Sequence, residues 1–177
     1  MPLDDKIKRF TGVIYRHIPS SPDENPKEYK YCGITEGRWN IGGEPTLYTG
    51  KSDVVCVCEY GRNMDKLGVS RDNALDRSIY KLSVELEFVL DLTDIVVLNN
   101  LGIDNIDAFK IQEKCRATAK HLRTSTKTQA IIVPSLALMD DLSKWCLVVF
   151  LEKVDTGENG FVKDCRFHRR FKISEVG

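Results

Sequence analysis

The alternation of apolar and polar side chains divides most of the chain into strands. Side chains in a strand point to opposite faces in turn, so the strict alternation over residues 78–90 predicts a strand with one face in water. Residues 10–17 are rich in β-branched and aromatic side chains and predict an earlier strand. Residues 47–49 predict a short extended segment. The uninterrupted apolar runs at 130–133 and 145–151 predict buried strands.

Two segments predict helices. Ser52 is a suitable N-cap, followed by Asp53 in the first turn, for a helix over about 53–65. A second helix is expected over about 105–121, where Asp104 or Asp107 caps its N-terminus.

The apolar run at residues 94–98 follows the long alternating segment closely, and we interpret it as a further short strand. The exposed edges of the resulting strands at 78–98 would then offer a surface for self-association. Residues 166–170, Arg-Phe-His-Arg-Arg, are expected to form a solvated edge strand.

Predicted strands outnumber helices and their order is mixed, so the expected class is α+β, with a mixed sheet and flanking helices. We see no internal repeat and no linker, and 177 residues suit a single domain that spans 1–177.

Composition excludes several classes of function. Hydrophobic residues make up 42% of the chain, close to the value for globular proteins. Lys+Arg and Asp+Glu are both 26, so the chain lacks the basic character of a nucleic-acid-binding protein, and we expect no direct nucleic-acid binding. No stretch approaches 18 apolar residues, so no membrane span is expected. The acidic, polar start at residues 1–6 does not resemble a secretory signal.

The cysteine pattern favours a reduced, cytoplasmic protein. The chain has six cysteines and no C-x-x-C pair, and its three histidines lack zinc-ligand spacing, so no metal site is expected. Cys56, Cys58 and Cys146 lie among valines and leucines, and we expect them to be buried, reduced side chains.

The densest group of candidate functional residues lies in and after residues 37–43. This glycine-flanked run contains Arg38 and Asn40, and it is followed by Tyr48 and Glu59. Glycine is used where the backbone turns sharply or a ligand comes close. The pattern predicts a binding loop that leads into a short strand and then a helix. The chain has no P-loop and no G-x-G-x-x-G, so any dinucleotide site would not be of the Rossmann type.

The pattern Gly37-Arg38-Trp39-Asn40-x-x-Gly43-x-Pro45-x-x-Tyr48 resembles the signature of the RES domain family. The resemblance spans about residues 10–152, with residues 153–177 taken as a C-terminal extension of the same domain. It implies a fold similar to ADP-ribosyltransferase toxins and a toxin of a bacterial toxin–antitoxin pair. It also implies NAD+ as the substrate rather than as a true cofactor, and a partner antitoxin with a helix-turn-helix domain.

Matched position by position, the resemblance implies that Arg16, Glu59 and Ser135 are catalytic. It implies further contacts with NAD+, for which the candidates are Arg38, Asn40, Tyr48 and Tyr15. Tyr15 is the neighbour of Arg16, although strand alternation points neighbouring side chains in opposite directions.

The sequence departs from the family at two places. Glu36 stands where a glycine is usual, and Cys146 where an asparagine often begins the strand after Ser135.

The chemistry of NAD+ suits these residue types. Guanidinium groups such as those of Arg16 and Arg38 bind phosphates in a bidentate manner, although either could instead pair with a surface glutamate. Loss of nicotinamide leaves an oxocarbenium-like ribose, which a carboxylate such as that of Glu59 stabilises. The alternative for Glu59 is an ordinary exposed position on a helix.

The remaining candidates also have two interpretations. Tyr48 either contacts the ligand or packs in the core with its hydroxyl at the surface. Ser135 either binds a phosphate or the nicotinamide amide, or it caps the segment after Pro134. Trp39 is expected to anchor the loop, and Asn40 to fix it through hydrogen bonds with the backbone.

Three functions therefore compete. The first is an enzyme that cleaves the nicotinamide–ribose bond of NAD+ with phosphate or water as the acceptor. The second is an ADP-ribosyltransferase that modifies a protein. The third is a non-catalytic module that binds a nucleotide or an antitoxin.

Overall fold

A computed structural model describes residues 3–175 of the chain. It contains strands, α-helices and several short 3-10 turns. The strands and α-helices are β1 (Lys8–Pro19), β2 (Thr46–Gly50), α1 (Asp53–Lys66), β3 (Arg77–Asp91), α2 (Ile95–Asn100), α3 (Gln112–Ser125), β4 (Ala130–Pro134), β5 (Trp145–Phe150) and β6 (Val162–Phe171).

The six strands form one mixed sheet in the order β1-β2-β5-β4-β3-β6. The pairing of β3 with β4 is parallel, and the other pairings are antiparallel. Strand β1 pairs with β3 along most of its length and also meets β2 at Tyr15 and Gly50. The pairings of β1, β2, β5, β4 and β3 therefore close into a ring. The expected α+β class, with a mixed sheet and flanking helices, is confirmed.

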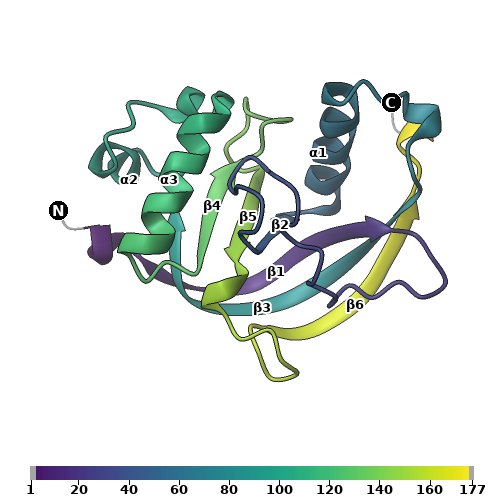
Figure 1. The fold of residues 1–177 in the computed structure, drawn as a ribbon, viewed down its shortest axis with the longest axis horizontal. Coiled ribbons are helices and arrows are strands. Elements are labelled where there is room, and N and C mark those ends of the chain that lie inside the picture. Colours follow the sequence, from purple (N-terminus) through teal and green to yellow (C-terminus); the bar gives the residue numbers. More distant parts are fainter. Residues whose placement is uncertain (1–2, 176–177) are drawn as a thin grey trace.

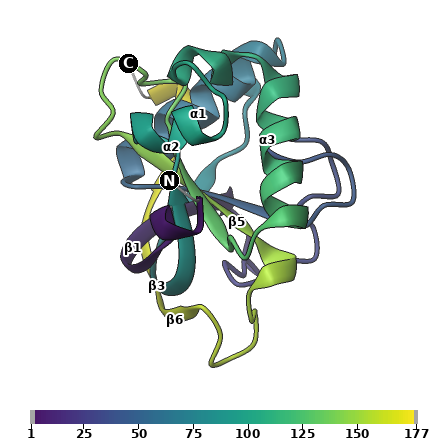
Figure 2. The same ribbon diagram turned by 90° about the vertical axis from the view of Figure 1, so that its left-hand side faces the viewer.

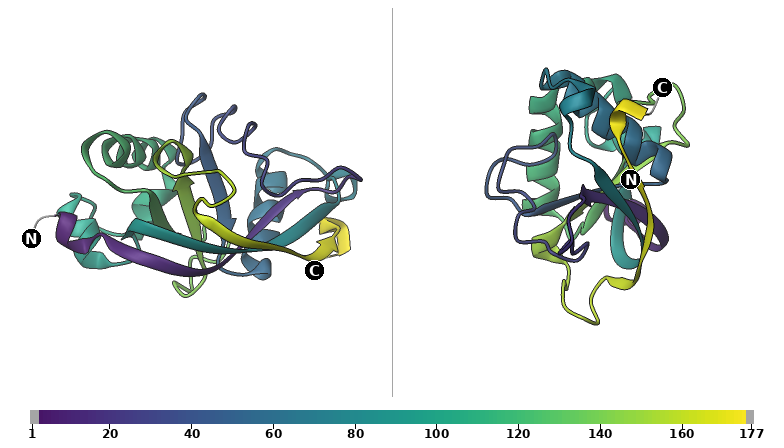
Figure 3. Two further views of the ribbon diagram at one scale, coloured as in Figure 1. Left: turned by 90° about the horizontal axis from the view of Figure 1, so that it is seen from below. Right: turned by 90° about the vertical axis from the view of Figure 1, so that its right-hand side faces the viewer.

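The long strands β1, β3 and β6 curve beneath the molecule, whereas β4, β5 and β2 rise between α3 and α1 (Figure 1). Figure 2 shows α3 upright beside β5. The view from below in Figure 3 shows the three long strands running side by side. The helices α1 and α3 thus stand on opposite sides of the short strands.

Separate apolar clusters hold the two helices. Helix α3 packs through Cys115, Ala119 and Leu122 on a cluster that includes residues of β4 and β5. Helix α1 packs through Val57 and Tyr60 on a different cluster, which includes residues of β3 and β6. Because no shared core fills the space between the two helices, polar side chains can line it.

Helix α1 begins as predicted, since the Ser52 side chain accepts a hydrogen bond of 3.3 Å from the backbone N–H of Val55. The prediction of a strand at 94–98 is wrong. The Asp94 side chain accepts from the N–H of Val96 at 2.8 Å and starts the short helix α2. An apolar run of this length is compatible with either structure, and the cap decides between them.

The predicted helix over 105–121 is two elements in the structure. A 3-10 turn covers Ile106–Lys110, and α3 begins only after the extended backbone of Ile111. Neither Asp104 nor Asp107 is the cap, because the side chain of Asn105 accepts from the N–H of Asp107 at 2.9 Å.

The prediction that the strands at 78–98 expose free edges is also wrong. Strand β3 pairs on both sides, with β1 and β6 along its first part and with β4 at its end. Strand β6 lies last in the strand order, so the basic segment 166–170 is part of an edge strand, as predicted.

All six cysteines are free thiols. Cys56 is buried as expected, but Cys58 and Cys146 are only half-buried. Within residues 3–175, no helix has both the length and the apolar character needed to span a membrane.

Candidate functional site

A cavity of ≈370 Å³, here called the main cavity, lies between α1, α3 and the loop that precedes β2. Helix α1 contributes Glu59 to its lining, and the loop contributes Arg38. Side chains of β4 and β5, including those of Val133 and Val148, also line it. The main cavity therefore occupies the space that the separate cores of α1 and α3 leave open.

Glu59 is held in one orientation by the segment after β4. Its Oε1 accepts a hydrogen bond of 2.6 Å from Ser135 Oγ and another of 3.0 Å from the N–H of Ala137. Ser135 is completely buried and does not line the cavity. The two predicted catalytic residues, 76 positions apart, are thus in direct contact. The serine hydroxyl is directed at the carboxylate rather than at the space a ligand would occupy.

Glu59 also lines a second space of ≈100 Å³, here called the small cavity. The main and small cavities share His17, Tyr48, Glu59 and Cys146, so the carboxylate lies where they join. The rest of the small cavity is formed by small or apolar groups, including Val55.

The side chains of Tyr48 and Asn40 fix the loop of residues 37–43, here called the signature loop. The Tyr48 hydroxyl donates to Asn40 Oδ1 at 2.7 Å and accepts from the N–H of Trp39 at 2.9 Å. Asn40 Nδ2 donates to the carbonyls of Thr35 and Ile41. Burial raises the pKa of Tyr48 to about 12, so its hydroxyl stays a donor at neutral pH.

The two side chains differ in their access to a ligand. Asn40 is 1% exposed, and its polar atoms bind within the loop, as predicted. Tyr48 is 40% exposed and lines both the main and the small cavity.

Gly37 is required by this arrangement. A Cβ atom at position 37 would lie 2.4 Å from both Asn40 Oδ1 and the Tyr48 hydroxyl oxygen. Trp39 anchors the same loop, since it is buried and its ring packs on Phe109 with centroids 5.0 Å apart. The glycine thus has a packing role, because only a residue without a side chain allows the tyrosine and asparagine to meet there.

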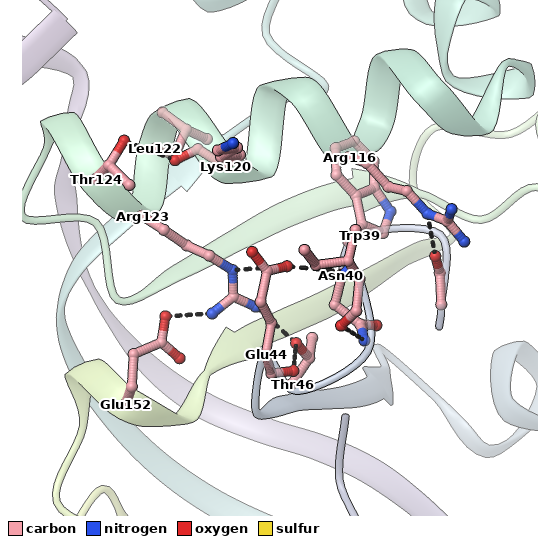
Figure 4. A network of polar contacts seen from close by, with 12 residues as sticks. Trp39, Asn40, Glu44, Thr46, Arg116, Lys120, Leu122, Arg123, Thr124 and Glu152 are labelled. Atoms are coloured by element: carbon pink, nitrogen blue, oxygen red, sulfur yellow. Dashed lines mark hydrogen bonds and ion pairs between the residues drawn. The ribbon is translucent and has the colours of Figure 1, made fainter. Parts of the chain in front are cut away.

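Helix α3 holds the loop from outside through residues on one helical face. Arg116 Nε donates to the carbonyl of Gly37 at 3.0 Å, and Gln112 Nε2 donates to the same oxygen at 3.3 Å. Two turns further along, Arg123 pairs with Glu152 and lies 4.0 Å from Glu44 (Figure 4). These contacts between α3 and the loop were not predicted from the sequence.

Arg38 lies in the wall of the main cavity opposite α1. Its guanidinium donates to the carbonyl oxygen of Phe109 at 2.8 Å and to that of Lys110 at 3.4 Å. Two carbonyl contacts leave other N–H groups of the guanidinium for a ligand.

The structure places Arg16 away from the main cavity. It lines a neighbouring space of ≈250 Å³, here called the side cavity, which shares His17, Glu36, Gly37 and Tyr48 with the main cavity. Arg16 is 7% exposed, and its guanidinium donates to the carbonyls of Pro26 and Glu28. It also stacks on Tyr29. In this structure Arg16 therefore fastens the loop after β1 to the sheet.

Tyr15, the neighbour of Arg16, does not line any of these three cavities. Its ring instead packs on His168 of β6, with centroids 5.5 Å apart.

His17 lines all three cavities and was missed by sequence analysis. Its Nδ1 accepts a hydrogen bond of 3.0 Å from Arg77 Nε, which places the imidazole proton on Nε2. Burial, and then the charges of Arg77 and Arg16, lower the pKa of His17 to about 3. The ring is therefore neutral at physiological pH.

Both departures from the family pattern border the site. Glu36 lines the main and side cavities and forms an ion pair of 3.0 Å with Arg116. Cys146 lines the main and small cavities, and burial raises the pKa of its thiol well above the usual value, which keeps it protonated.

Sequence analysis also missed Arg62, Asn63 and Lys66, which line the main cavity from α1. Their spacing from Glu59 was the available signal, because positions three, four and seven residues apart share one face of a helix. No comparable signal marked His17, since strand alternation only placed it on the face opposite Arg16.

Comparison with known proteins identifies a similar fold and a family. The structure of a toxin–antitoxin complex of M. tuberculosis, MbcT-MbcA, contains a chain of similar fold. The TM-score is 0.68 at 18% sequence identity, and the match covers 94% of this chain and 89% of the other. Among curated protein sequences, none gives a significant match. The RES domain family model matches residues 13–169, and the chain therefore belongs to the RES domain family.

Proposed function

We propose that this protein is an enzyme that consumes NAD+ by cleaving the bond between nicotinamide and ribose, with phosphate or water as the acceptor. The observation that carries this proposal is the placement of Glu59. Its carboxylate is oriented by Ser135 and Ala137 and lies where the main and small cavities join.

The two hydrogen bonds to Glu59 both end on Oε1, which leaves Oε2 without a partner among the described residues. A carboxylate oxygen in this position can accept a hydrogen bond from the ribose 2′-hydroxyl and stabilise positive charge on the ribose carbon. Such charge develops when a glycosidic bond breaks through an oxocarbenium-like state. Because Ser135 and the Ala137 N–H fix the carboxylate beforehand, little reorganisation is needed as the charge appears.

The proposed reaction breaks the bond between ribose C1′ and the nicotinamide nitrogen. The electron pair of that bond leaves with nicotinamide, which becomes neutral. An oxygen of water or phosphate then bonds to C1′. Water gives ADP-ribose and a proton, and phosphate gives ADP-ribose 1″-phosphate.

The small cavity suits the nicotinamide end of the substrate. The nicotinamide of NAD+ is cationic, and a charged imidazole beside it would oppose binding. His17 avoids this repulsion because it is neutral. Tyr48 offers an exposed aromatic face on the same cavity.

The test is the release of nicotinamide from NAD+ by the purified protein, with and without phosphate. We expect wild-type protein to release it, and Glu59→Gln to lower kcat by at least about 100-fold. Ser135→Ala should lower kcat by about tenfold with little change in KM, because it disturbs the orientation of Glu59 without removing the charge.

Thermal unfolding of both variants is the control for a general loss of structure. Unchanged kcat in folded Glu59→Gln would contradict the proposal.

Radiolabelled NAD+ added to a lysate separates the alternatives. A labelled protein band indicates ADP-ribosyl transfer, and tight binding without turnover indicates a non-catalytic module.

We infer in addition that the protein acts as the toxin of a toxin–antitoxin pair. Its partner would be a cognate antitoxin that has a helix-turn-helix domain, as the resemblance to the RES domain family implies. Family membership supports this, as does the fold shared with a chain solved as part of a toxin–antitoxin complex. If a neighbouring gene encodes such a protein, co-expression should yield a complex with lower NAD+ consumption. Failure of the two proteins to co-purify would contradict the inference.

A further inference from the structure

One face of α1 carries a carboxylate and two cations along the main cavity. Glu59, Arg62 and Lys66 line it, and they are spaced by three and four residues, which places them on the same side of the helix. Only Glu59 also reaches the small cavity. The cations therefore lie along the main cavity, away from the junction with the small cavity.

Within residues 3–175, no carboxylate forms an ion pair with either cation. Arg62 has no hydrogen bond or ion pair with any described residue other than those of its own helix backbone. Among the described residues, the hydrogen-bond partner of Lys66 Nζ is the neutral side chain of Gln112 on α3, at 3.0 Å. Most other basic side chains around the loop already have partners, as Arg16 does with carbonyls and Arg116 with Glu36.

We propose that Arg62 and Lys66 form the subsite for the diphosphate of the dinucleotide. This rests on the proposed function, in that Glu59 marks the position of the nicotinamide ribose. An α-helix rises about 1.5 Å per residue, so Arg62 starts about 4.5 Å and Lys66 about 10 Å beyond Glu59 along the axis. The order of carboxylate, first cation and second cation matches the order of ribose, first phosphate and second phosphate in the ligand.

The contact between Lys66 and Gln112 gives the subsite a further property. Gln112 also donates to the carbonyl of Gly37 in the signature loop. A bound diphosphate is a stronger hydrogen-bond acceptor for an ammonium group than a neutral amide is. Lys66 Nζ therefore exchanges Gln112 Oε1 for a phosphate oxygen when the ligand binds. Ligand binding thereby frees the Gln112 oxygen at the point where α1, α3 and the loop meet.

The test compares ligands with and without the diphosphate. Binding of ADP-ribose and of nicotinamide riboside is measured by calorimetry for wild type, Arg62→Gln, Lys66→Gln and the double variant. We expect each single change to raise the Kd of ADP-ribose roughly tenfold, the usual effect of losing a charged hydrogen-bond donor. The Kd of nicotinamide riboside should change by less than about twofold, because it has no phosphate.

Two controls accompany the measurement. Lys120→Gln removes a positive charge from the exposed surface of α3, outside the main cavity, and should leave both Kd values unchanged. Lys66→Arg keeps the charge and should retain most of the affinity for ADP-ribose.

Equal losses for both ligands, or no loss for either, would overturn the subsite. So would a wild-type protein that fails to bind ADP-ribose at all. If ADP-ribose binds in a manner that depends on Arg62 and Lys66 but NAD+ is not consumed, the subsite stands and the proposed enzymatic function fails.

Discussion

At the scale of single residues, the site depends on groups whose partners lie far away in the sequence. Glu59 is oriented by Ser135, and His17 is held by Arg77. In both pairs a buried or half-buried neighbour fixes the state of a group that faces a cavity. For Glu59 the neighbour fixes the direction of a charge, and for His17 it fixes the position of a proton.

The lowered pKa of His17 predicts a specific sensitivity to acid. Between pH 6.5 and about 3, the unfolded chain binds a proton at this imidazole that the folded chain excludes. Stability therefore falls as the pH drops below 6.5, by up to about 1.4 kcal/mol per pH unit from this group. Urea unfolding from pH 7 to pH 4 should show a shallower pH dependence for His17→Gln than for wild type.

Other groups also titrate in this range, so the comparison needs a matched variant. His121 is exposed on α3, and His121→Gln should unfold with the pH dependence of wild type. Identical slopes for His17→Gln and wild type would contradict the assignment of a neutral, buried His17.

Part of the site was predictable from the sequence. The signature run identified the residues of the loop, and the Ser52 cap placed Glu59 on a helix. The surroundings of Arg16 were not predictable, because the loop that it fastens has no periodicity that would show where it packs. Arg62 lies outside the family pattern, and its helical spacing from Glu59 was the signal that would have predicted it.

At the scale of elements, helix α3 supports a loop that has little regular structure of its own. Gln112, Arg116 and Arg123 lie on the face of α3 that meets the loop. Figure 4 shows the two arginines. They bind carbonyl, carboxylate and hydroxyl oxygens between Glu36 and Thr46. The loop is thus shaped by long-range contacts, which explains how an irregular segment can form a defined cavity wall.

Gly37 is the position where this packing is tightest, so Gly37→Ala should be costly. The added methyl group would overlap Asn40 Oδ1 and the Tyr48 hydroxyl, each 2.4 Å from the new Cβ. Overpacking of this kind costs about 1–3 kcal/mol of stability, and moving Tyr48 should also raise the KM for NAD+. Urea unfolding and steady-state kinetics measure the two effects.

Gly42→Ala is the matched control in the same loop. A Cβ at position 42 would come no closer than 3.4 Å to a neighbour, the carbonyl oxygen of Ile34. We expect this variant to behave as wild type in both measurements. Equal effects at positions 37 and 42 would show that the loop responds to any added side chain.

Elements with strong local signals were predicted well, and those that depend on an aspartate or asparagine cap were not. Helix α1 carries its own start signal at Ser52, and β3 its alternation. By contrast, α2 depends on Asp94, and the break before α3 depends on the turn that Asn105 begins. An aspartate or asparagine in front of an apolar run is common in loops as well, so neither was distinctive in the sequence.

At the scale of the whole molecule, β3 is the central strand. It pairs with β1, β4 and β6, and so connects the long curved strands to the short strands beneath the site. Its pairing with β4 is parallel, and α2 and α3 lie in the connection between these two strands. These pairings join residues that are distant in the chain, which is why the order of strands could not be derived from local patterns.

The position of β6 predicts the effect of shortening the chain. A protein that ends at Asp155 would lose β6 and with it Phe161, Phe171 and Ile173, which are buried. It would also expose the side of β3 that carries the pairing with β6. We expect no cooperative thermal transition by circular dichroism for this shorter chain, whereas the full chain should show one. A sharp transition in the shorter chain would show that residues 156–177 are dispensable for folding.

The two ends of the described chain lie on opposite sides of the molecule (Figure 1). The last turn packs against α1, since Ile173 would lie 3.1 Å from a side chain at Gly61, two residues from Glu59. The first turn, Leu3–Lys6, lies instead beside α2. An affinity tag, a fluorophore or a tether to a sensor surface should therefore be attached at the N-terminus, where it leaves the cavity entrance open to small molecules.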